Sequence, residues 1–223
     1  MDIIEWLDNR GIKVNDPDLI REAFMHSSYA NEHHGKHDNE RLEFMGDAVL
    51  QLWSTNAIFP LNLSEGQMTR LRAQLVCEHA LAIYGRKLHL NGFLLLGMGE
   101  EKTGGREKDA IIADMFEAFL GALFLDQGWP AVDSILNETL LTYLDHPEDV
   151  AEIDYKTRLQ EYVQADSRRT VHYELVDETG PSNAPEFTMN AVVDGLIMGT
   201  GKGSSKKQAE QNAARNAFEK MVK

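Results

Sequence analysis

Residues Asn39–Leu52 read NERLEFMGDAVLQL, and the fold is organised around this stretch. Wound as a helix at about 100° per residue, it places Glu40, Glu43 and Asp47 on one face. These acids repeat at i+3 and i+4 with no Lys or Arg between them on that face, and like charges at such spacings destabilise a helix by about 0.2–0.5 kcal/mol per pair. The face is therefore either solvated or paired with a cation. The opposite, apolar face is typical of a helix packed on a core and consists of Leu42, Met45, Val49 and Leu52.

A second stretch, Ala110–Leu125, reads AIIADMFEAFLGALFL and is apolar on every side, which predicts a helix buried all round. It nevertheless carries Asp114 and Glu117 and contains no Lys or Arg. Burying an unpaired charged carboxylate is so costly that the group takes up a proton instead. Two interpretations stay open. One is a protonated, hydrogen-bonded acid pair, and the other is a four-carboxylate pocket with Glu43 and Asp47 that binds a hard cation such as Mg²⁺.

The two acidic stretches closely resemble motifs of the bacterial ribonuclease III family. NERLEFMGDAVL resembles the long acidic motif of that family, and IIADMFEAFLGALFLD resembles its second acidic helix. The likeness covers essentially the whole chain, because the C-terminal part resembles the double-stranded-RNA-binding domain that follows in these enzymes. The resemblance implies a metal-dependent endoribonuclease that acts on double-stranded RNA.

The pattern predicts two domains joined by a linker. Residues 1–146 show helical periodicity and form the all-α ribonuclease III catalytic domain. Within them, His26–His37 and Leu94–Arg106 are expected to be loops, and Ser64–Arg86 is one helix or two in line. The linker is placed at residues 147–152, which contain Pro and acids with little to bury.

Residues 153–223 form the smaller predicted domain, where the pattern changes to mixed helix and strand. A helix at Tyr155–Gln164 precedes two alternating stretches, Val171–Asp177 and Phe187–Val193, that predict half-buried strands. A short third strand and a closing helix at Ser205–Met221 follow. This α-β-β-β-α order is that of the double-stranded-RNA-binding fold, so the whole chain is predicted to be α+β.

The formal net charge of −14 argues at first sight against a nucleic-acid partner. However, residues 152–223 hold 10 Lys and Arg against 11 Asp and Glu, whereas the remainder holds 12 against 25. The acidity is thus concentrated where we expect the cation pocket. A nearly neutral C-terminal module predicts modest RNA affinity with a marked dependence on salt.

The cysteine content and the hydropathy indicate the compartment. Cys77 is the only cysteine, which excludes an internal disulfide framework and favours a reducing interior. The N-terminal MDIIEWLDNRG is acidic and amphipathic, unlike a signal peptide, and no apolar run reaches the roughly 18 residues of a membrane span. We therefore expect a cytoplasmic protein without membrane attachment.

Lysines crowd the N-terminus of the closing helix, where cations oppose the macrodipole. Free backbone N–H groups with lysines beside them form a phosphate-binding site, so we predict RNA contacts there from Lys202, Ser205, Lys206 and Lys207. The segment GTGKGSS is not a nucleotide-binding loop, because Gly203 stands where Ser or Thr is required. No nucleotide cofactor is expected.

The resemblance implies further RNA contacts. Thr157, Gln160 and Glu161 match family positions that face a minor groove, where 2′-hydroxyls need neutral donors and acceptors. Asn183 stands where the family often has His, which predicts a weaker second minor-groove contact. The segment Lys102–Arg106, KTGGR, is implied to be a substrate-contacting loop, with a plain connector as the alternative.

We hypothesise hydrolysis by metal-activated water. The residues expected to hold Mg²⁺, with Mn²⁺ as a substitute, are Glu43, Asp47, Asp114 and Glu117. Among these, Asp47 and Glu117 are assigned as catalytic, while Glu40 and Glu65 are assigned supporting roles.

The resemblance also implies a homodimer with Phe44 and Met45 at the interface, and staggered products with 3′ overhangs and 5′ phosphates, in rRNA and mRNA processing. A non-catalytic RNA-binding regulator is the alternative, but it would need changes among the four carboxylates, and the sequence has none. A hydrolase of small nucleotides is a second alternative.

Overall fold

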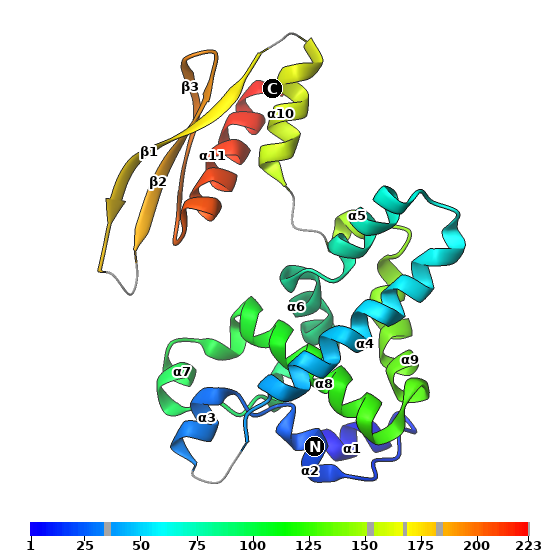
Figure 1. The fold of residues 1–223 in the computed structure, drawn as a ribbon. Coiled ribbons are helices and arrows are strands. Elements are labelled where there is room, and N and C mark those ends of the chain that lie inside the picture. Colours follow the sequence, from blue (N-terminus) through cyan, green and yellow to red (C-terminus); the bar gives the residue numbers. More distant parts are fainter. Residues whose placement is uncertain (34–36, 151–153, 167–168, 182–184, 223) are drawn as a thin grey trace. The chain divides into compact units, whose positions relative to one another are not determined.

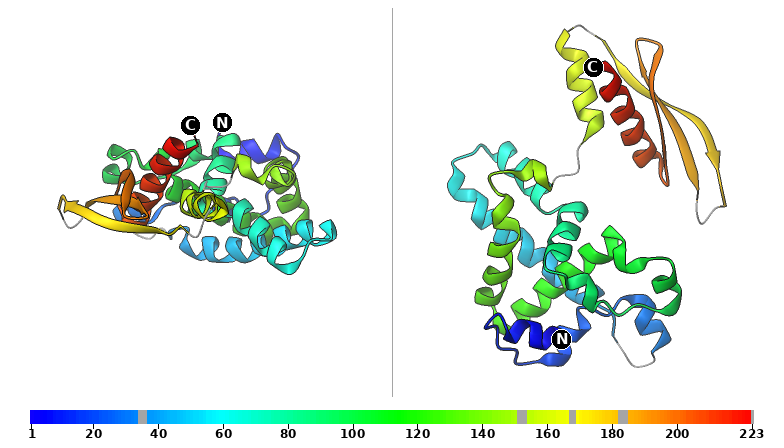
Figure 2. Two further views of the ribbon diagram at one scale, coloured as in Figure 1. Left: turned by 90° about the horizontal axis from the view of Figure 1, so that it is seen from above. Right: turned by 180° about the vertical axis from the view of Figure 1, so that it is seen from behind.

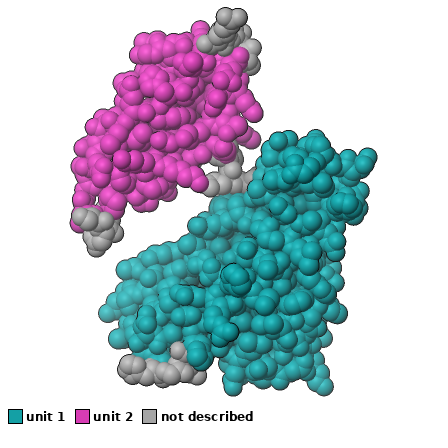
Figure 3. All heavy atoms as spheres, in the orientation of Figure 1, with its two compact units in different colours: residues 1–152 teal, residues 153–223 magenta. Residues whose placement is uncertain are grey.

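The computed structural model describes residues 1–33, 37–150, 154–166, 169–181 and 185–222. The chain forms two compact units, Met1–Glu152 and Ile153–Lys223, coloured separately in Figure 3. Each unit has a hydrophobic core of its own. The first unit is helical and the second combines a sheet with helices, which confirms the predicted α+β class.

Unit 1 is built around the crossing of two long helices, α4 and α8 (Figure 1). Its α-helices are α1 (Ile3–Asp8), α2 (Pro17–Glu22), α3 (Ser27–Glu32), α4 (Glu40–Ile58), α5 (Glu65–Leu75), α6 (Glu78–Lys87), α7 (Met98–Lys102), α8 (Asp109–Gln127) and α9 (Trp129–Glu138). Short 3-10 helices follow several of them, namely η1 (Phe59–Leu61), η2 (Leu90–Phe93), η3 (Gly105–Glu107), η4 (Leu140–Tyr143) and η5 (Pro147–Asp149). No described helix is both long and apolar enough to cross a membrane.

Helix α8 runs through the core of unit 1, as its all-round apolar sequence predicts. Its buried residues point in every direction and include Ile112, Met115, Phe116, Phe119 and Leu123, which are fully inaccessible. Burial of each such side chain contributes about 1.5–3 kcal/mol. The unit therefore depends on α8 for its stability as well as for the acids that α8 carries.

Two of the expected loops contain helix. Part of the segment His26–His37 forms α3, and part of Leu94–Arg106 forms α7. Both helices are too short to be stable alone, and contacts distant in sequence hold them, as when the Met98 N–H donates to the Glu32 carboxylate over 3.0 Å. Such contacts leave no periodic signal in the sequence.

Other boundaries differ as well. Leu52 was expected on the core face of α4, but it is 56% exposed because Trp53, one residue on, fills the core position. Part of the expected linker 147–152 belongs to unit 1, since η5 forms there and the Val150 side chain is fully buried in the core. Residues 151 and 152 lie outside the described residues.

Unit 2 is a three-stranded antiparallel sheet with order β1-β2-β3. Its elements are α10 (Tyr155–Asp166), β1 (Val171–Thr179), β2 (Glu186–Val193), β3 (Leu196–Gly203) and α11 (Lys206–Met221). Both helices lie on the same face of the sheet (Figure 2). At Asp194 and Gly195 the φ angles are 50° and 80°, as a two-residue hairpin between β2 and β3 requires.

The closing helix α11 approaches the sheet closely because both sides of the contact are small. Ala209, Ala213 and Ala217 are fully buried on α11. Opposite them on β3, a Cβ atom at Gly199 or Gly201 would overlap the α11 backbone. This close packing fixes the position of the N-terminus of α11, where the lysines lie.

Candidate functional site

Helices α4 and α8 cross with their backbones in close approach at two glycines. A Cβ atom at Gly46 would overlap the Glu117 carbonyl oxygen, and one at Gly121 would overlap that of Leu42. Only glycine permits such an approach. The crossing therefore brings the acidic face of α4 against the side of α8 that carries Asp114 and Glu117, as the electrostatics of these groups also show.

Four carboxylates share this crossing. Burial, followed by the nearby charges of Asp47, Glu43 and Asp114, raises the pKa of Glu117 to about 8. Burial also raises the pKa of Glu43, with Asp114, Glu40 and Asp47 acting in the same direction. The structure thus brings together the four residues that the sequence singled out as a cation pocket.

The four acids lack ion-pair partners among the described residues. Within the described ranges, no Lys, Arg or His forms an ion pair with any of the four carboxylates. Two basic residues of α6, Arg86 and His79, pair instead with Asp109 at the start of α8, at 2.6 and 3.1 Å. Three of the four acids are partly desolvated, and none of the four forms an ion pair in this part of the chain.

The donor set fits a hard divalent cation. Carboxylate oxygens are the ligands that Mg²⁺ prefers, and this ion keeps several waters instead of requiring a closed protein cage. In the described part of the chain, no three His, Cys, Asp or Glu side chains are already grouped tightly enough to hold a metal. Like charges repel, so an open arrangement is expected of these carboxylates by themselves.

The alternative of a protonated acid pair requires a hydrogen bond between Asp114 and Glu117. No such bond contributes to the pKa of either group. Their raised pKa values come from burial first and from neighbouring acids second. A bound cation would remove both effects at once.

The two supporting acids lie in different places. Glu40 is exposed in the first turn of α4 and raises the pKa of Glu43. Glu65 lies in the first turn of α5, where it accepts a 3.2 Å hydrogen bond from Thr69 and lines a hollow of about 210 Å³ with Thr55. Thr55 is eight residues beyond Asp47 on α4, about 12 Å along the helix. Within one chain, Glu65 is therefore separate from the four-carboxylate group.

Sequence reasoning missed two residues that face Asp114. After burial, the largest influence on the pKa of Asp114 is Glu78, which raises it, and His26 lowers it. Glu78 is in the first turn of α6, where an acid needs no explanation beyond the helix dipole. His26 is the first residue of the segment His26–His37, for which the sequence predicts a loop. Both residues are distant in sequence from Asp114, and no motif spacing indicates that they lie close to it.

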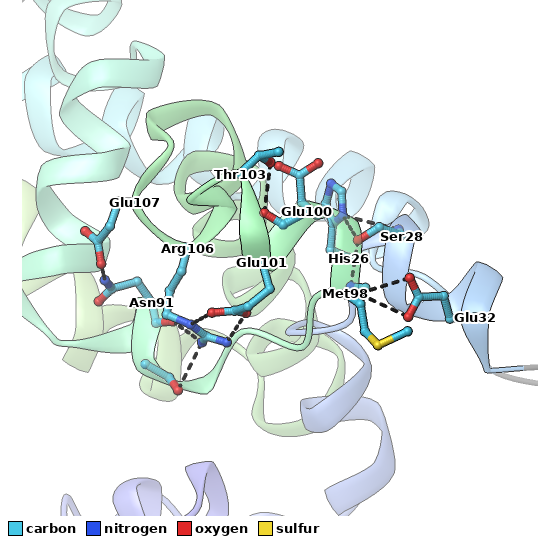
Figure 4. A network of polar contacts seen from close by, with 12 residues as sticks. His26, Ser28, Glu32, Asn91, Met98, Glu100, Glu101, Thr103, Arg106 and Glu107 are labelled. Atoms are coloured by element: carbon cyan, nitrogen blue, oxygen red, sulfur yellow. Dashed lines mark hydrogen bonds and ion pairs between the residues drawn. The ribbon is translucent and has the colours of Figure 1, made fainter.

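The segment Lys102–Arg106 is held by acids of α7 that precede it in the chain (Figure 4). Arg106 donates to Glu101 at 2.7 Å and to the Asn91 carbonyl at 2.9 Å. Lys108, just beyond the segment, donates to Glu100 at 2.6 Å. The guanidinium of Arg106, which was expected to contact substrate, is thus already bound to neighbouring groups of unit 1.

In unit 2, the predicted RNA-contacting residues of α10 share one side of the helix. Thr157, Gln160 and Glu161 are exposed, opposite the buried Leu159 and Val163. The Thr157 hydroxyl donates to Asp154 at 2.7 Å. Asn183, the predicted second minor-groove contact, lies outside the described residues.

The lysines around the N-terminus of α11 differ in whether they form ion pairs within unit 2. Lys202 pairs with Glu186 at 2.7 Å, which raises the pKa of the lysine. Lys206 lies 5.7 Å over the Phe187 ring, and no described residue pairs with Lys206 or Lys207. Ser205 caps the helix by accepting the Gln208 N–H.

Phe44 and Met45, the predicted interface residues, have different surroundings. Phe44 is 82% exposed on α4. Met45 is partly buried and packs against the core of unit 1. Near the other end of α4, Leu52 borders a hollow of about 490 Å³ with Trp53 and Trp129.

Comparisons with known proteins agree with this geometry. Residues 16–144 match the family model described as Ribonuclease-III-like, and residues 155–221 match the double-stranded RNA binding motif. The chain is 42% identical to Ribonuclease 3 of Listeria welshimeri over 222 residues, 98% of this chain and 97% of that protein. It is 45% identical to Ribonuclease 3 of Oceanobacillus iheyensis over 225 residues, 99% of each. The solved nuclease domain of Campylobacter jejuni ribonuclease III is 34% identical, with a TM-score of 0.57 over 62% of this chain and 96% of that domain.

Proposed function

This chain belongs to the ribonuclease III family, and from that premise we propose that it hydrolyses double-stranded RNA with divalent ions held between α4 and α8. The family membership and the RNA-binding motif support the activity and the substrate. The observation that supports the metal is a group of four acids that form no ion pair in the described part of the chain, three of which, Glu43, Asp114 and Glu117, have pKa values raised by burial. We expect Mg²⁺ in use, with Mn²⁺ able to replace it.

The proposed ligands are Glu43, Asp47, Asp114 and Glu117. Ions bound there would lower the pKa of an attacking water and stabilise the departing 3′ oxygen. Burial first, and then the neighbouring acids, raise the pKa of Glu117 to about 8, so we assign it the tightest coupling to chemistry, together with Asp47. Glu40 adds negative charge beside Glu43.

Unit 2 supplies most of the binding in this proposal. The exposed side of α10 meets a minor groove through Thr157, Gln160 and Glu161, where neutral and polar groups recognise 2′-hydroxyls. Lys206 and Lys207 meet phosphates beside the N-terminus of α11. Lys202 contributes less, because Glu186 already neutralises it.

We propose a homodimer, because one chain carries one such pocket while a duplex has two strands to cut. The exposed Phe44 and Leu52 on α4, with the hollow beside Leu52, provide an apolar surface for a second copy. A self-complementary two-fold interface is the usual solution, and the nuclease domain of the Campylobacter jejuni relative has a region involved in dimer formation. Two pockets acting on opposite strands would give staggered ends with 3′ overhangs and 5′ phosphates.

For the cellular setting, we propose a cytoplasmic enzyme that processes rRNA and mRNA precursors. Its single cysteine suits a reducing compartment. Structured transcripts of these classes provide the long duplexes that the binding unit is built to recognise.

Cleavage of a long RNA duplex, with Mg²⁺ and with excess chelator, tests the proposal. We expect cutting only with the metal, products with two recessed 5′ ends, and no turnover of mononucleotides. Duplex binding without any cutting would favour the non-catalytic regulator. Release of product from mononucleotides would favour the small-nucleotide hydrolase.

A further inference from the structure

The first turn of α10 is capped by a carboxylate whose two oxygens have different partners. Asp154 lies directly before α10, and its Oδ1 accepts the Thr157 backbone N–H at 3.1 Å, as the side chain of an N-cap residue does. Its other oxygen, Oδ2, accepts a hydrogen bond from the Thr157 hydroxyl at 2.7 Å. The Asp154 carboxylate therefore determines the direction of this hydroxyl as well as the start of the helix.

Gln211 of α11 holds this carboxylate in place. Its Nε2 donates to Oδ1 of Asp154 at 2.9 Å, and its Oε1 accepts the Lys156 N–H at 3.3 Å. The first N–H groups of a helix have no partner within it, so α11 satisfies one of those of α10. With two N–H donors on Oδ1, the carboxylate is left with Oδ2 for the Thr157 hydroxyl.

The ionisation of Asp154 decides which partner donates in the Thr157 hydrogen bond. Burial by itself raises the pKa of Asp154, but hydrogen bonds from Gln211 and Thr157 outweigh burial and lower the pKa below its ordinary value. An ionised carboxylate only accepts hydrogen bonds, whereas a hydroxyl has one proton and two lone pairs. Because its proton points at Asp154, the Thr157 hydroxyl can only accept a hydrogen bond from a ligand.

Thr157 is exposed on the side of α10 that we assign to the minor groove. An RNA 2′-hydroxyl can donate the proton that such an acceptor requires, and this group distinguishes RNA from DNA. We propose that Asp154, held by Gln211, is a positioning residue for RNA specificity, because it makes the Thr157 hydroxyl an acceptor for a 2′-hydroxyl. This inference rests on the proposed binding of duplex RNA by unit 2.

Asp154→Asn separates this role from helix capping. Asn is as good an N-cap residue as Asp, and its single oxygen can keep the N–H groups of Thr157 and Gln211. Its amide nitrogen then faces the Thr157 hydroxyl and donates to it, so the proton of the hydroxyl turns outward. The opposite orientation of the amide would place its NH₂ group against two N–H donors. The variant thus keeps the cap and turns the acceptor at Thr157 into a donor.

Three further variants and a charge control complete the set. Thr157→Val removes the hydroxyl at nearly constant volume, and Thr157→Ser keeps it. Thr200→Val is the matched control, because the Thr200 hydroxyl also donates at 2.7 Å, to Asn190. The glycines on either side of Thr200 face α11, so strand alternation places its side chain on the other face of the sheet. Asp177→Asn removes an exposed carboxylate of β1 and controls for charge.

The experiment compares the affinity of the full chain for two duplexes of one sequence, with either 2′-hydroxyl or 2′-fluoro groups, in chelator at one salt concentration. The 2′-fluoro duplex keeps the A-form helix but cannot donate a proton. Both duplexes carry the same phosphates, so the general effect of removing an acid cancels in the ratio of the two affinities. Thermal melting of each variant reports whether the fold is kept.

We expect the wild type to prefer the 2′-hydroxyl duplex. Asp154→Asn and Thr157→Val should each reduce this preference about fivefold for each unit 2 that is bound, the factor that corresponds to one net hydrogen bond. Thr157→Ser, Thr200→Val and Asp177→Asn should keep the wild-type preference.

An unchanged preference in Asp154→Asn, beside a reduced one in Thr157→Val, would show that Asp154 does not set the direction of the hydroxyl. An unchanged preference in Thr157→Val would overturn the inference at its first step. A wild type that binds both duplexes equally would overturn the proposed minor-groove contact together with the inference. Absence of cleavage with Mg²⁺ is a separate result, since binding is measured in chelator: it would overturn the proposed enzyme and leave this inference standing.

Discussion

The α4–α8 crossing and unit 2 differ in whether their charged side chains form ion pairs. At the crossing, four acids lie together without an ion pair in the described ranges, and burial raises the pKa of Glu117 and Glu43. In unit 2, four of the eight described Lys and Arg side chains form ion pairs, including Lys202 with Glu186 and Arg215 with Glu219. Only a few lysines remain for a polyanion.

This difference in ion pairing predicts that unit 1, and not unit 2, is destabilised by its functional residues. Unpaired, partly buried acids destabilise unit 1 in the absence of a ligand, and in the proposed function a bound cation offsets this cost. Unit 2 is nearly neutral and half of its described cations form ion pairs, so its binding depends on a few residues and on salt. Chemistry should therefore fail through single changes in unit 1, and binding through changes in unit 2.

The largest expected effect comes from Glu117→Gln, which keeps the shape of the side chain and removes its charge. Loss of several kcal/mol of metal-derived stabilisation corresponds to about 10³-fold in rate. Single-turnover cleavage of duplex RNA should fall by that factor, while duplex affinity in chelator stays unchanged. Asp8→Asn, an acid-to-amide change at an exposed position of α1, is the control and should cut normally. Equal losses of cutting and binding in Glu117→Gln would contradict the division of labour between the units.

Gly46→Ala tests whether the glycine crossing sets the site. The added methyl group would overlap the Glu117 carbonyl, so the helices must separate, at a cost of about 1–3 kcal/mol. Misplacement of the carboxylates by about 1 Å should lower the cleavage rate about 10²-fold. Circular dichroism melting and single-turnover cleavage measure the two effects.

Gly66→Ala is the matched control for that variant. A Cβ atom at Gly66 in α5 meets only the end of the Arg70 side chain, at 3.8 Å, so the change should stabilise the helix by up to about 1 kcal/mol and leave cutting intact. If both alanine variants cut at the wild-type rate, the close approach of α4 and α8 does not determine the site.

Gly46 illustrates which features of the fold and of the site could be predicted from the sequence and which could not. The periodicity of α4, the apolar run of α8 and the alternation of β1 and β2 are strong local signals, and the structure has those elements. The four carboxylates could be grouped because acids in an apolar helix need a partner. The positions of Gly46, His26 and Glu78 could not be inferred, because each depends on segments distant in the chain that the fold brings together. Leu52 was placed wrongly because helical phase alone does not say whether position 52 or Trp53 faces α9.

In unit 2 a smaller effect is expected from changing Lys206 and Lys207 together to Ala. If each contacts one phosphate, the slope of log affinity against log salt should decrease by about two, with the cleavage rate at saturating RNA unchanged. Lys202→Ala should change the slope less, because Glu186 already neutralises that lysine. Filter binding from low to physiological salt gives the slopes. A larger effect from Lys202 than from the pair would mean that RNA displaces Glu186 and that the pairing in unit 2 does not limit binding.

The last expected effect does not involve catalysis and is the pH dependence of stability in the metal-free protein. The pKa of Glu117 is about 8 in the folded chain, against an ordinary value of 4.5, so between these two values the folded state binds more protons than the unfolded state. Stability therefore falls as pH rises through this window and stops changing above it. Glu117→Gln lacks this contribution, so in chelator its melting temperature should decrease less between pH 5 and pH 8, with about 2–4 °C for each kcal/mol relieved. Asp8→Asn should follow the wild type. Parallel curves of melting temperature against pH for the wild type and Glu117→Gln would show that the charged form of Glu117 is not destabilised in the folded chain. The acids at the α4–α8 crossing would then not differ from the charged residues of unit 2 in their effect on stability.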